Sequence, residues 1–168
     1  MVNKMESDVE SDVKRELEDK RRALNELIET VDNFKNSGKS DDAVENYLTR
    51  FLVLRACGYV EHVFRRSVCS YVEKKAGVGI CELVENALFT RGLNPKRKKV
   101  KEILKSLDSE LYDDFLELLG DGDDLDSLVE SRNKIAHGCS DNCTKRRSIE
   151  QGKLAIEIGD WFLRNFFN

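Results

Sequence analysis

Three side chains in the last third of the chain could act together on a phosphate ester: Arg132, Asn133 and His137. Histidine gains and loses a proton near neutral pH, which suits general acid–base catalysis. Arginine offers a permanent charge and a planar fork of donors for a phosphate, and Asn133 could hold that phosphate or orient the histidine. Cleavage of RNA without a metal needs these groups, because a base must take the proton of the 2′-hydroxyl and a cation must stabilise the charge that develops on the phosphorane.

These residues lie on a helix that we predict over 124–137. At about 100° per residue, the apolar stripe of this helix consists of Leu125, Leu128, Val129, Ile135 and Ala136. Arg132 falls in the middle of that stripe, and a buried arginine is rare unless it is paired. Asn133 and His137 share a face, with Glu130 on the same flank. Spacing alone leaves two interpretations open: a cleft or interface that needs a fixed charge, or an edge arginine beside a histidine that caps the helix.

The remaining elements are predicted from apolar residues spaced by three, four or seven positions. They are helices over residues 6–35, 40–76, 80–89, 94–107, 109–119 and 144–167. Ser40 is predicted to cap the second helix and Pro95 to occupy a first helical position, while Gly77 and Gly138 are predicted stops and residues 36–38 end the first helix. Since no run alternates with period two, we predict an all-α antiparallel bundle.

The first helix differs from the others because its apolar stripe is narrow and its other faces are highly charged. We therefore predict two parts: an N-terminal charged helical arm over residues 1–38, which could pack on a partner, and a helical domain over residues 39–168.

Charge is unevenly distributed along a chain whose net charge is −4. One basic cluster spans residues 96–101, and it is either a solvated helix face or a phosphate-binding patch. The other consists of Lys145, Arg146 and Arg147 at the predicted start of the last helix, where positive charge opposes the helix dipole. Because an anion would relieve that repulsion, we predict that these three residues bind RNA phosphates.

The five cysteines are odd in number and do not resemble a disulfide framework, so we expect a reducing, cytoplasmic setting. The N-terminal residues lack the apolar stretch of a secretory signal, and no run approaches the roughly 18 apolar residues of a membrane span. Cys139 and Cys143 follow His137 closely and could bind zinc, but a structural zinc site usually has four ligands and no fourth is nearby. We therefore expect no metal and no cofactor.

The segment Leu128-Val129-Glu130-x-Arg132-Asn133-x-Ile135-Ala136-His137-Gly138 closely resembles the signature of the HEPN superfamily, an arginine and a histidine with four to six residues between them and a polar residue after the arginine. It looks most like the RiboL-PSP subgroup. Upstream, residues 55–65 resemble the second core helix of that subgroup, and residues 94–107 resemble the stretch in between. The resemblance covers about residues 40–168.

This resemblance implies a bundle of four to five core helices, here with an additional N-terminal helix, that forms a homodimer. The two motifs would meet across the two-fold axis and cleave RNA without a metal, leaving a 2′,3′-cyclic phosphate. Arg132, Asn133 and His137 take the catalytic positions of the family, with Glu61 and Glu130 as candidate supporting residues. Many relatives act in toxin–antitoxin or anti-phage systems, which implies an antitoxin or another defence protein as a partner.

Two interpretations without catalysis stay open. HEPN-like domains also serve as scaffolds or as modules that bind a partner or RNA without cleaving it. A regulatory helical protein that dimerises through residues 6–35 would need no nucleic acid at all.

Overall fold

The computed structural model describes residues 2–35, 38–89, 94–139 and 143–167. Within these ranges the chain forms helices and no strand, which confirms the all-α prediction. The helices are α1 (Val2–Asn33), α2 (Lys39–Ala76), α3 (Val78–Phe89), α4 (Arg97–Leu107), α5 (Ser109–Leu119), α6 (Asp124–Ala136) and α7 (Lys145–Phe166). None of these helices is long and apolar enough for a bilayer span.

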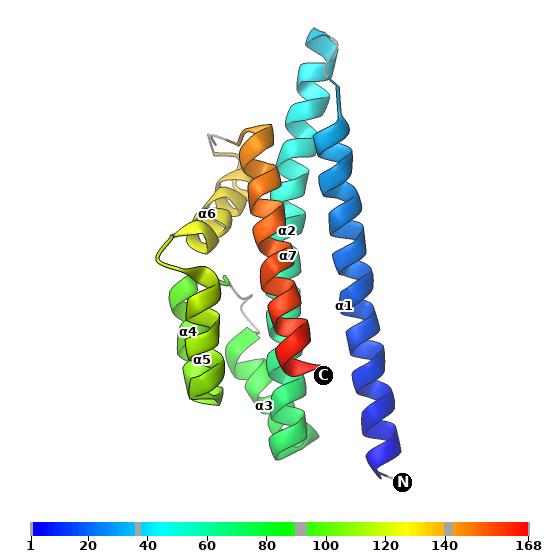
Figure 1. Ribbon diagram of the computed structural model, residues 1–168, viewed down its shortest axis with the longest axis vertical. Coiled ribbons are helices and arrows are strands. Elements are labelled where there is room, and N and C mark those ends of the chain that lie inside the picture. The colour runs from blue at the N-terminus through cyan, green and yellow to red at the C-terminus, as the bar shows by residue number, and fades with distance from the viewer. Residues whose placement is uncertain (1, 36–37, 90–93, 140–142, 168) are drawn as a thin grey trace.

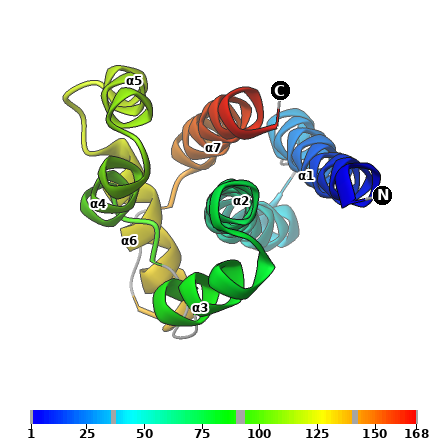
Figure 2. The same cartoon turned by 90° about the horizontal axis from the view of Figure 1, so that it is seen from below.

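Helices α2 and α7 form the centre of the molecule and pack extensively on each other. Figure 1 shows α1, α2 and α7 side by side along the long axis. Seen from below, α2 is surrounded by α7, α1, α3 and α6, whereas α4 and α5 pack on each other at the side of the molecule (Figure 2). The two central helices therefore provide the rigid frame on which the shorter helices are placed.

An aromatic cluster joins three of these helices. The ring of Phe162 on α7 lies 5.4 Å from that of Phe64 on α2 and 5.7 Å from that of Phe115 on α5, measured between centroids. Next to it, the indole nitrogen of Trp161 donates a 2.6 Å hydrogen bond to Asp114. Burial of these large rings, with the indole nitrogen satisfied, holds α5 against α7.

The stripe of α1 is covered by the same chain. Leu17, Leu24 and Val31 are buried in the common core, and α1 packs on both α2 and α7. Arg21 of α1 also forms an ion pair with Asp160 of α7 through both carboxylate oxygens. In this structure the apolar stripe of α1 is therefore covered by α2 and α7 and is not open to a partner. The division of the chain into an arm and a domain at residue 38 stays a prediction.

Helix ends agree with the prediction where a glycine sets them. Gly77 and Gly138 have φ values of +86° and +66° and follow the ends of α2 and α6. The predicted cap at Ser40 is wrong, because α2 begins at Lys39 after Gly38. Residues 36 and 37, part of the predicted stop after the first helix, lie outside the described ranges.

The predicted role of Pro95 is also wrong, since α4 begins two residues later, at Arg97. The backbone N–H of Arg97 donates a 2.7 Å hydrogen bond to the carboxylate of Asp126. A side chain of α6 therefore satisfies the start of α4, and no pattern local to residues 94–97 could have indicated this.

Candidate active site on α6

The site is built on α6, which is fixed to the central helices. Leu125, Leu128 and Val129 are buried in the core, and Ser131 accepts a 3.2 Å hydrogen bond from the side-chain amide of Gln151 on α7. The part of α6 that precedes Arg132 is therefore held rigidly, and Arg132 emerges where the core ends.

Arg132 is positioned by two polar partners. Its guanidinium forms an ion pair with Glu61 of α2, with 3.3 Å between nitrogen and oxygen, and donates a 3.1 Å hydrogen bond to the side-chain oxygen of Asn133. The side chains of Arg132 and Glu61 are 27% and 30% exposed, respectively. The charged guanidinium of Arg132 is thus paired with a carboxylate, which offsets the cost of its partial burial. Part of the side chain still reaches solvent.

A third neighbour of Arg132 is the thiol of Cys57, a residue that the sequence did not single out. Burial raises the pKa of the Cys57 thiol, and a hydrogen bond with Arg132 opposes part of that rise. The thiol therefore stays neutral beneath the guanidinium and fills the space there. The available signal was its position four residues before Glu61, which places both side chains on the same face of α2.

His137 lies at the C-terminal end of α6, and its side chain is exposed. Two backbone hydrogen bonds close the helix around it, from Gly138 to the carbonyl of Ile135 (3.1 Å) and from Cys139 to the carbonyl of Lys134 (2.9 Å). This pair of bonds forms a Schellman motif. The motif fixes the backbone at His137 and leaves the imidazole accessible to a substrate.

The two candidate supporting carboxylates differ in where they lie. Glu61 contacts Arg132, whereas Glu130 forms a 2.8 Å ion pair with Lys134 on the exposed side of α6. That hydrogen bond with Lys134 is also the main reason why the pKa of Glu130 is lowered. Of the two, only Glu61 is in a position to orient the arginine.

The three basic residues at the start of α7 point in different directions. Lys145 donates a 2.8 Å hydrogen bond to the carbonyl of Phe34 beside the end of α1. Arg146 forms an exposed 2.8 Å ion pair with Glu150, and Arg147 donates a 2.7 Å hydrogen bond to Ser127 of α6. Arg147 is therefore tied to the helix of the site, while Lys145 holds α1 in place.

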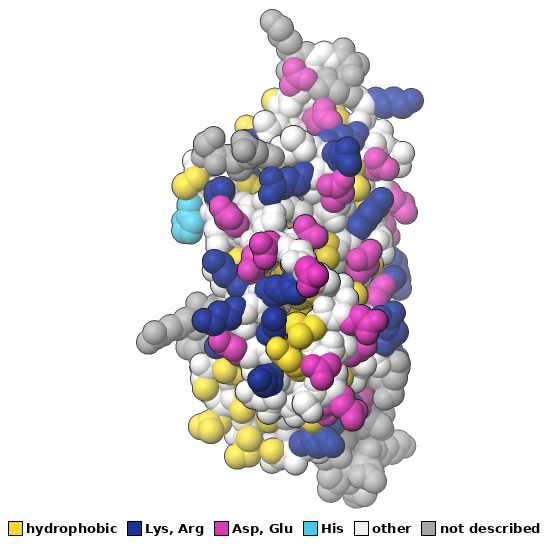
Figure 3. Space-filling model, turned by 60° about the vertical axis from the view of Figure 1, so that its left-hand side comes forward, with side chains coloured by type: hydrophobic (Ala, Val, Ile, Leu, Met, Phe, Trp, Pro, Cys, Tyr) yellow, Lys and Arg dark blue, Asp and Glu magenta, His cyan; other side chains and the backbone are white. Residues whose placement is uncertain are grey.

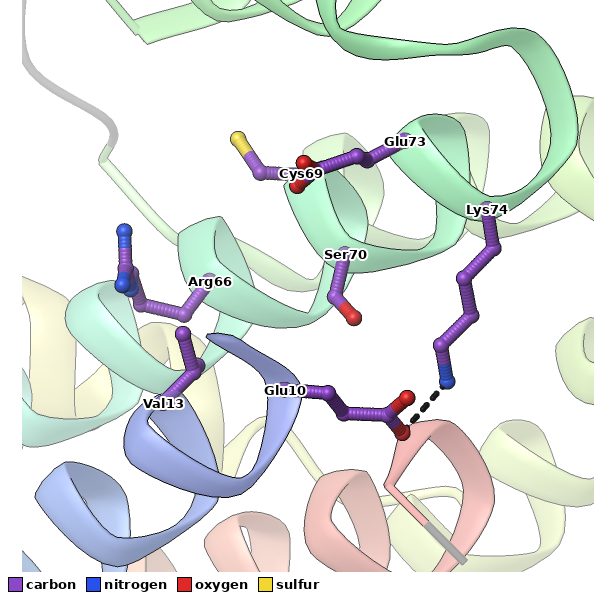
Figure 4. A pocket seen from close by; sticks show the side chains of 7 residues that line it. All are labelled: Glu10, Val13, Arg66, Cys69, Ser70, Glu73 and Lys74. Atoms are coloured by element: carbon purple, nitrogen blue, oxygen red, sulfur yellow. Dashed lines mark hydrogen bonds and ion pairs between the residues drawn. The ribbon is translucent and has the colours of Figure 1, made fainter. Parts of the chain in front are cut away.

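A pocket elsewhere in the molecule contains none of the predicted residues. It lies between α1 and α2, is lined in part by Val13 and Cys69, and is crossed by the 2.6 Å ion pair of Glu10 and Lys74 (Figure 4). His137, by contrast, is exposed, and an accessible imidazole fits a polymer better than a small enclosed ligand.

Cys139 and Cys143 are the possible zinc ligands that the sequence offers next to His137. Among the described residues, no three His, Cys, Asp or Glu side chains are grouped so that they could hold a metal ion. The segment 140–142 between the two cysteines lies outside the described ranges.

Comparison with protein families finds a match that covers most of the chain. The family described as RiboL-PSP-HEPN matches residues 16–158, which includes α2 to α6 and more than half of both α1 and α7. The match begins within the segment predicted to be a separate arm. Among curated proteins and among solved structures, no chain matches this one.

Proposed function

This chain belongs to the RiboL-PSP-HEPN family, and on that basis we propose that it is an endoribonuclease that cleaves RNA without a metal ion. The observation that carries the proposal is the arrangement on α6. Arg132 is held between Glu61 and Asn133 on the helix that ends at the exposed His137. A fixed cation and an accessible imidazole on one short helix can act on the same phosphate.

In the proposed reaction, the imidazole of His137 removes the proton of a 2′-hydroxyl, and the resulting oxygen attacks the adjacent phosphorus. The bond from phosphorus to the 5′-oxygen breaks, and that oxygen takes a proton from an imidazolium. The products are a 2′,3′-cyclic phosphate and a 5′-hydroxyl. Arg132 stabilises the charge that develops on the non-bridging oxygens, a role that its planar donors suit.

Base and acid are both imidazoles in this scheme, which requires two chains. The sequence has two histidines, and His62 is turned toward α1, where its ring lies 2.9 Å from a carboxylate oxygen of Glu16. The second imidazole would therefore be His137 of another copy. We propose that the active unit is a homodimer in which two copies of the motif share one cleft.

An exposed apolar stripe on α2 supports such a dimer. Val44, Tyr47 and Phe51 are 45%, 72% and 50% exposed, and their spacing of three and four residues places them on one face of the helix. Glu61 lies on the flank of that face, further along the same helix. A second copy packed on this stripe would bring its own α6 toward the first, and burial of the stripe would contribute to association.

Arg147 and Arg146 are the residues of the second basic cluster that we propose to contact RNA beside the cleft. Lys145 contributes less, because its ammonium group already binds the carbonyl of Phe34. We further propose a cytoplasmic role in defence, with an antitoxin or another defence protein as partner. All five cysteines are free thiols in the structure, which fits a reducing compartment.

The test uses end-labelled single-stranded RNA in EDTA with the wild type and three variants. General acid–base groups and donors that stabilise developing charge each contribute at least roughly 10²-fold to rate. Arg132→Ala and His137→Ala should therefore cleave at least about 100-fold more slowly. Lys134→Ala, which changes an exposed residue between them, should cleave at a rate close to that of the wild type. If the wild type and the variants are equally inactive on every RNA, a module that binds without cleaving becomes the better description.

A further inference from the structure

Helix α4 and the residue before it carry positive charge that the structure does not neutralise. Residues 96–105 contain five lysines, one arginine and one acid, Glu102. The arginine, Arg97, is committed to the fold, because its guanidinium donates to the carbonyls of Gly120 and Gly122. The charge that remains belongs to the lysines.

Three of those lysines, Lys98, Lys101 and Lys105, line a groove together with Tyr112 of α5 and the carboxylates of Glu102 and Asp126. The ammonium groups of Lys101 and Lys105 lie over the ring of Tyr112, 5.9 and 5.7 Å from its centroid. Within the described part of the chain neither of these two forms an ion pair, and Lys98 reaches Glu102 only at 4.0 Å. Like charges four residues apart on a helix repel each other, so an anion bound between them would relieve that repulsion.

The groove borders the helix of the candidate active site, because Asp126 of α6 lines it and accepts a hydrogen bond from the backbone N–H of Arg97. Glu130 on α6 lies two residues before Arg132, and besides Lys134 both Lys96 and Arg147 help to lower its pKa. The basic residues before α4 and at the start of α7 therefore approach the same carboxylate. On this side of the molecule, Lys and Arg side chains lie over the middle of the surface with Asp and Glu side chains among them (Figure 3).

We propose that Lys98, Lys101 and Lys105 bind phosphates of the RNA strand that flanks the cleaved position. This inference rests on the proposed function and adds a second contact for its substrate. From Asp126, which caps α4, to His137 is about 16 Å along α6 at 1.5 Å per residue. A substrate that reaches both places must extend well beyond the two nucleotides at the cleaved bond.

The experiment compares Lys101→Gln/Lys105→Gln with Lys35→Gln/Lys75→Gln. The control pair removes the same number of positive charges near the C-terminal ends of α1 and α2. Lys75 is also comparable in its surroundings, because its ammonium group lies 5.8 Å from the centroid of the Tyr71 ring. Binding of a long single-stranded RNA is measured by fluorescence anisotropy over a range of salt concentrations. His137→Ala is present in every protein so that the RNA stays intact. Cleavage of a dinucleotide and of the long RNA is measured with His137 present.

For single strands each lost phosphate contact reduces the salt slope by about 0.7. The α4 pair should therefore lower the slope by about 1.4 and slow cleavage of the long RNA at limiting concentration, while the dinucleotide is cleaved at the wild-type rate. The control pair should change none of these values. An unchanged slope in the α4 variant, with cleavage by the wild type intact, would overturn this inference and leave the proposed function standing. Binding that depends on the α4 lysines without any cleavage would support the inference and refute the nuclease.

Discussion

The geometry of Arg132 is set by polar partners at the edge of the core. A carboxylate and an amide hold the guanidinium, and a buried thiol lies against it. A side chain that is ordered before the substrate arrives loses less conformational freedom on binding. Within the proposed mechanism Glu61 is thus a positioning residue, whose removal should affect the chemical step more than the binding of RNA.

Glu61→Gln should lower kcat about 10- to 100-fold and change KM by less than about threefold, since misplacement of a group by about an ångström can cost that much rate. The measurement is steady-state cleavage of a labelled RNA. Glu130→Gln is the matched control, because it changes another carboxylate near Arg132 that pairs instead with exposed Lys134. Equal effects of the two variants, or an effect of Glu61→Gln on KM alone, would contradict the positioning role.

His62 predicts a pH dependence of stability. Burial lowers the pKa of His62 below its ordinary value of 6.5, and the nearby cations Lys20 and Arg66 add to this lowering against the opposing effect of Glu16. As the pH falls through 6.5, the unfolded chain takes up this proton before the folded chain does, so the free energy of unfolding decreases. Chemical denaturation between pH 8 and 5 should show this decrease in the wild type and a smaller one in His62→Gln.

His137→Gln serves as the control for that series, because His137 is exposed. Its stability should fall with pH as that of the wild type does. A His62→Gln profile identical to that of the wild type would show that His62 is not the group responsible.

Part of the site could be predicted because it lies within one helix. Arg132, Asn133 and His137 are close in sequence, so helical periodicity alone places them together. The pair of Glu61 and Arg132 spans 71 positions, and only the family resemblance pointed to Glu61. The sequence places Cys57 on the same face of α2 as Glu61, but it could not show that this face meets Arg132, because that contact depends on how α2 and α6 pack.

At the scale of the helices, α2 and α7 approach closely because one of them carries a glycine. A Cβ atom at Gly159 would collide with the ring of Tyr59 on α2. Tyr59 is buried, and its hydroxyl has no hydrogen-bond partner within the described part of the chain. The ring is too rigid to yield easily, so this contact fixes the distance between the central helices.

Gly159→Ala should therefore destabilise the protein by about 1–3 kcal/mol, the usual cost of overpacking a core. Gly79→Ala is the matched control, since the Cβ position at Gly79 in α3 has open space around it. The control should be neutral or stabilise by up to about 1 kcal/mol, because alanine favours helix. Urea denaturation measures both variants. Equal stability of the two would show that the approach of α2 to α7 is not set at Gly159.

Each helix could be predicted from periodicity, but several of their starts could not. The stops at Gly77 and Gly138 depend on the left-handed backbone of one residue, which is a local property. The start of α4 depends on Asp126, which is 29 positions away from Arg97. A cap that comes from another helix leaves no signal in the sequence around the helix that it caps.

At the scale of the whole molecule, α2 has one apolar face in the core and a second one exposed. Periodicity counts Val44, Tyr47 and Phe51 among the apolar residues of this helix and cannot tell whether a partner comes from the same chain or from another. The structure leaves them exposed, and clustered exposed apolar side chains are typical of interaction surfaces. The proposed dimer gives this face a partner.

Phe51→Glu should shift the protein from dimer to monomer in sedimentation velocity and reduce cleavage in parallel. A charge placed in an apolar interface must be desolvated, whereas in the monomer Phe51 is half exposed and its replacement costs little stability. Arg22→Gln on α1 makes the same change in net charge at an exposed position and should leave both properties unchanged. A Phe51→Glu protein that remains a dimer would show that the two copies meet elsewhere.

In the proposed mechanism, His137 and Arg132 promote attack by a 2′-hydroxyl on the neighbouring phosphorus. The most direct measurement identifies the 3′ end of the cleaved RNA by mass spectrometry, in EDTA, with a second substrate that carries a single 2′-deoxy sugar at the cleaved position. We expect a 2′,3′-cyclic phosphate from the wild type, no cleavage of the deoxy substrate at that position, and no product from His137→Ala. A 3′-hydroxyl end, or cleavage at the deoxy sugar, would contradict this mechanism.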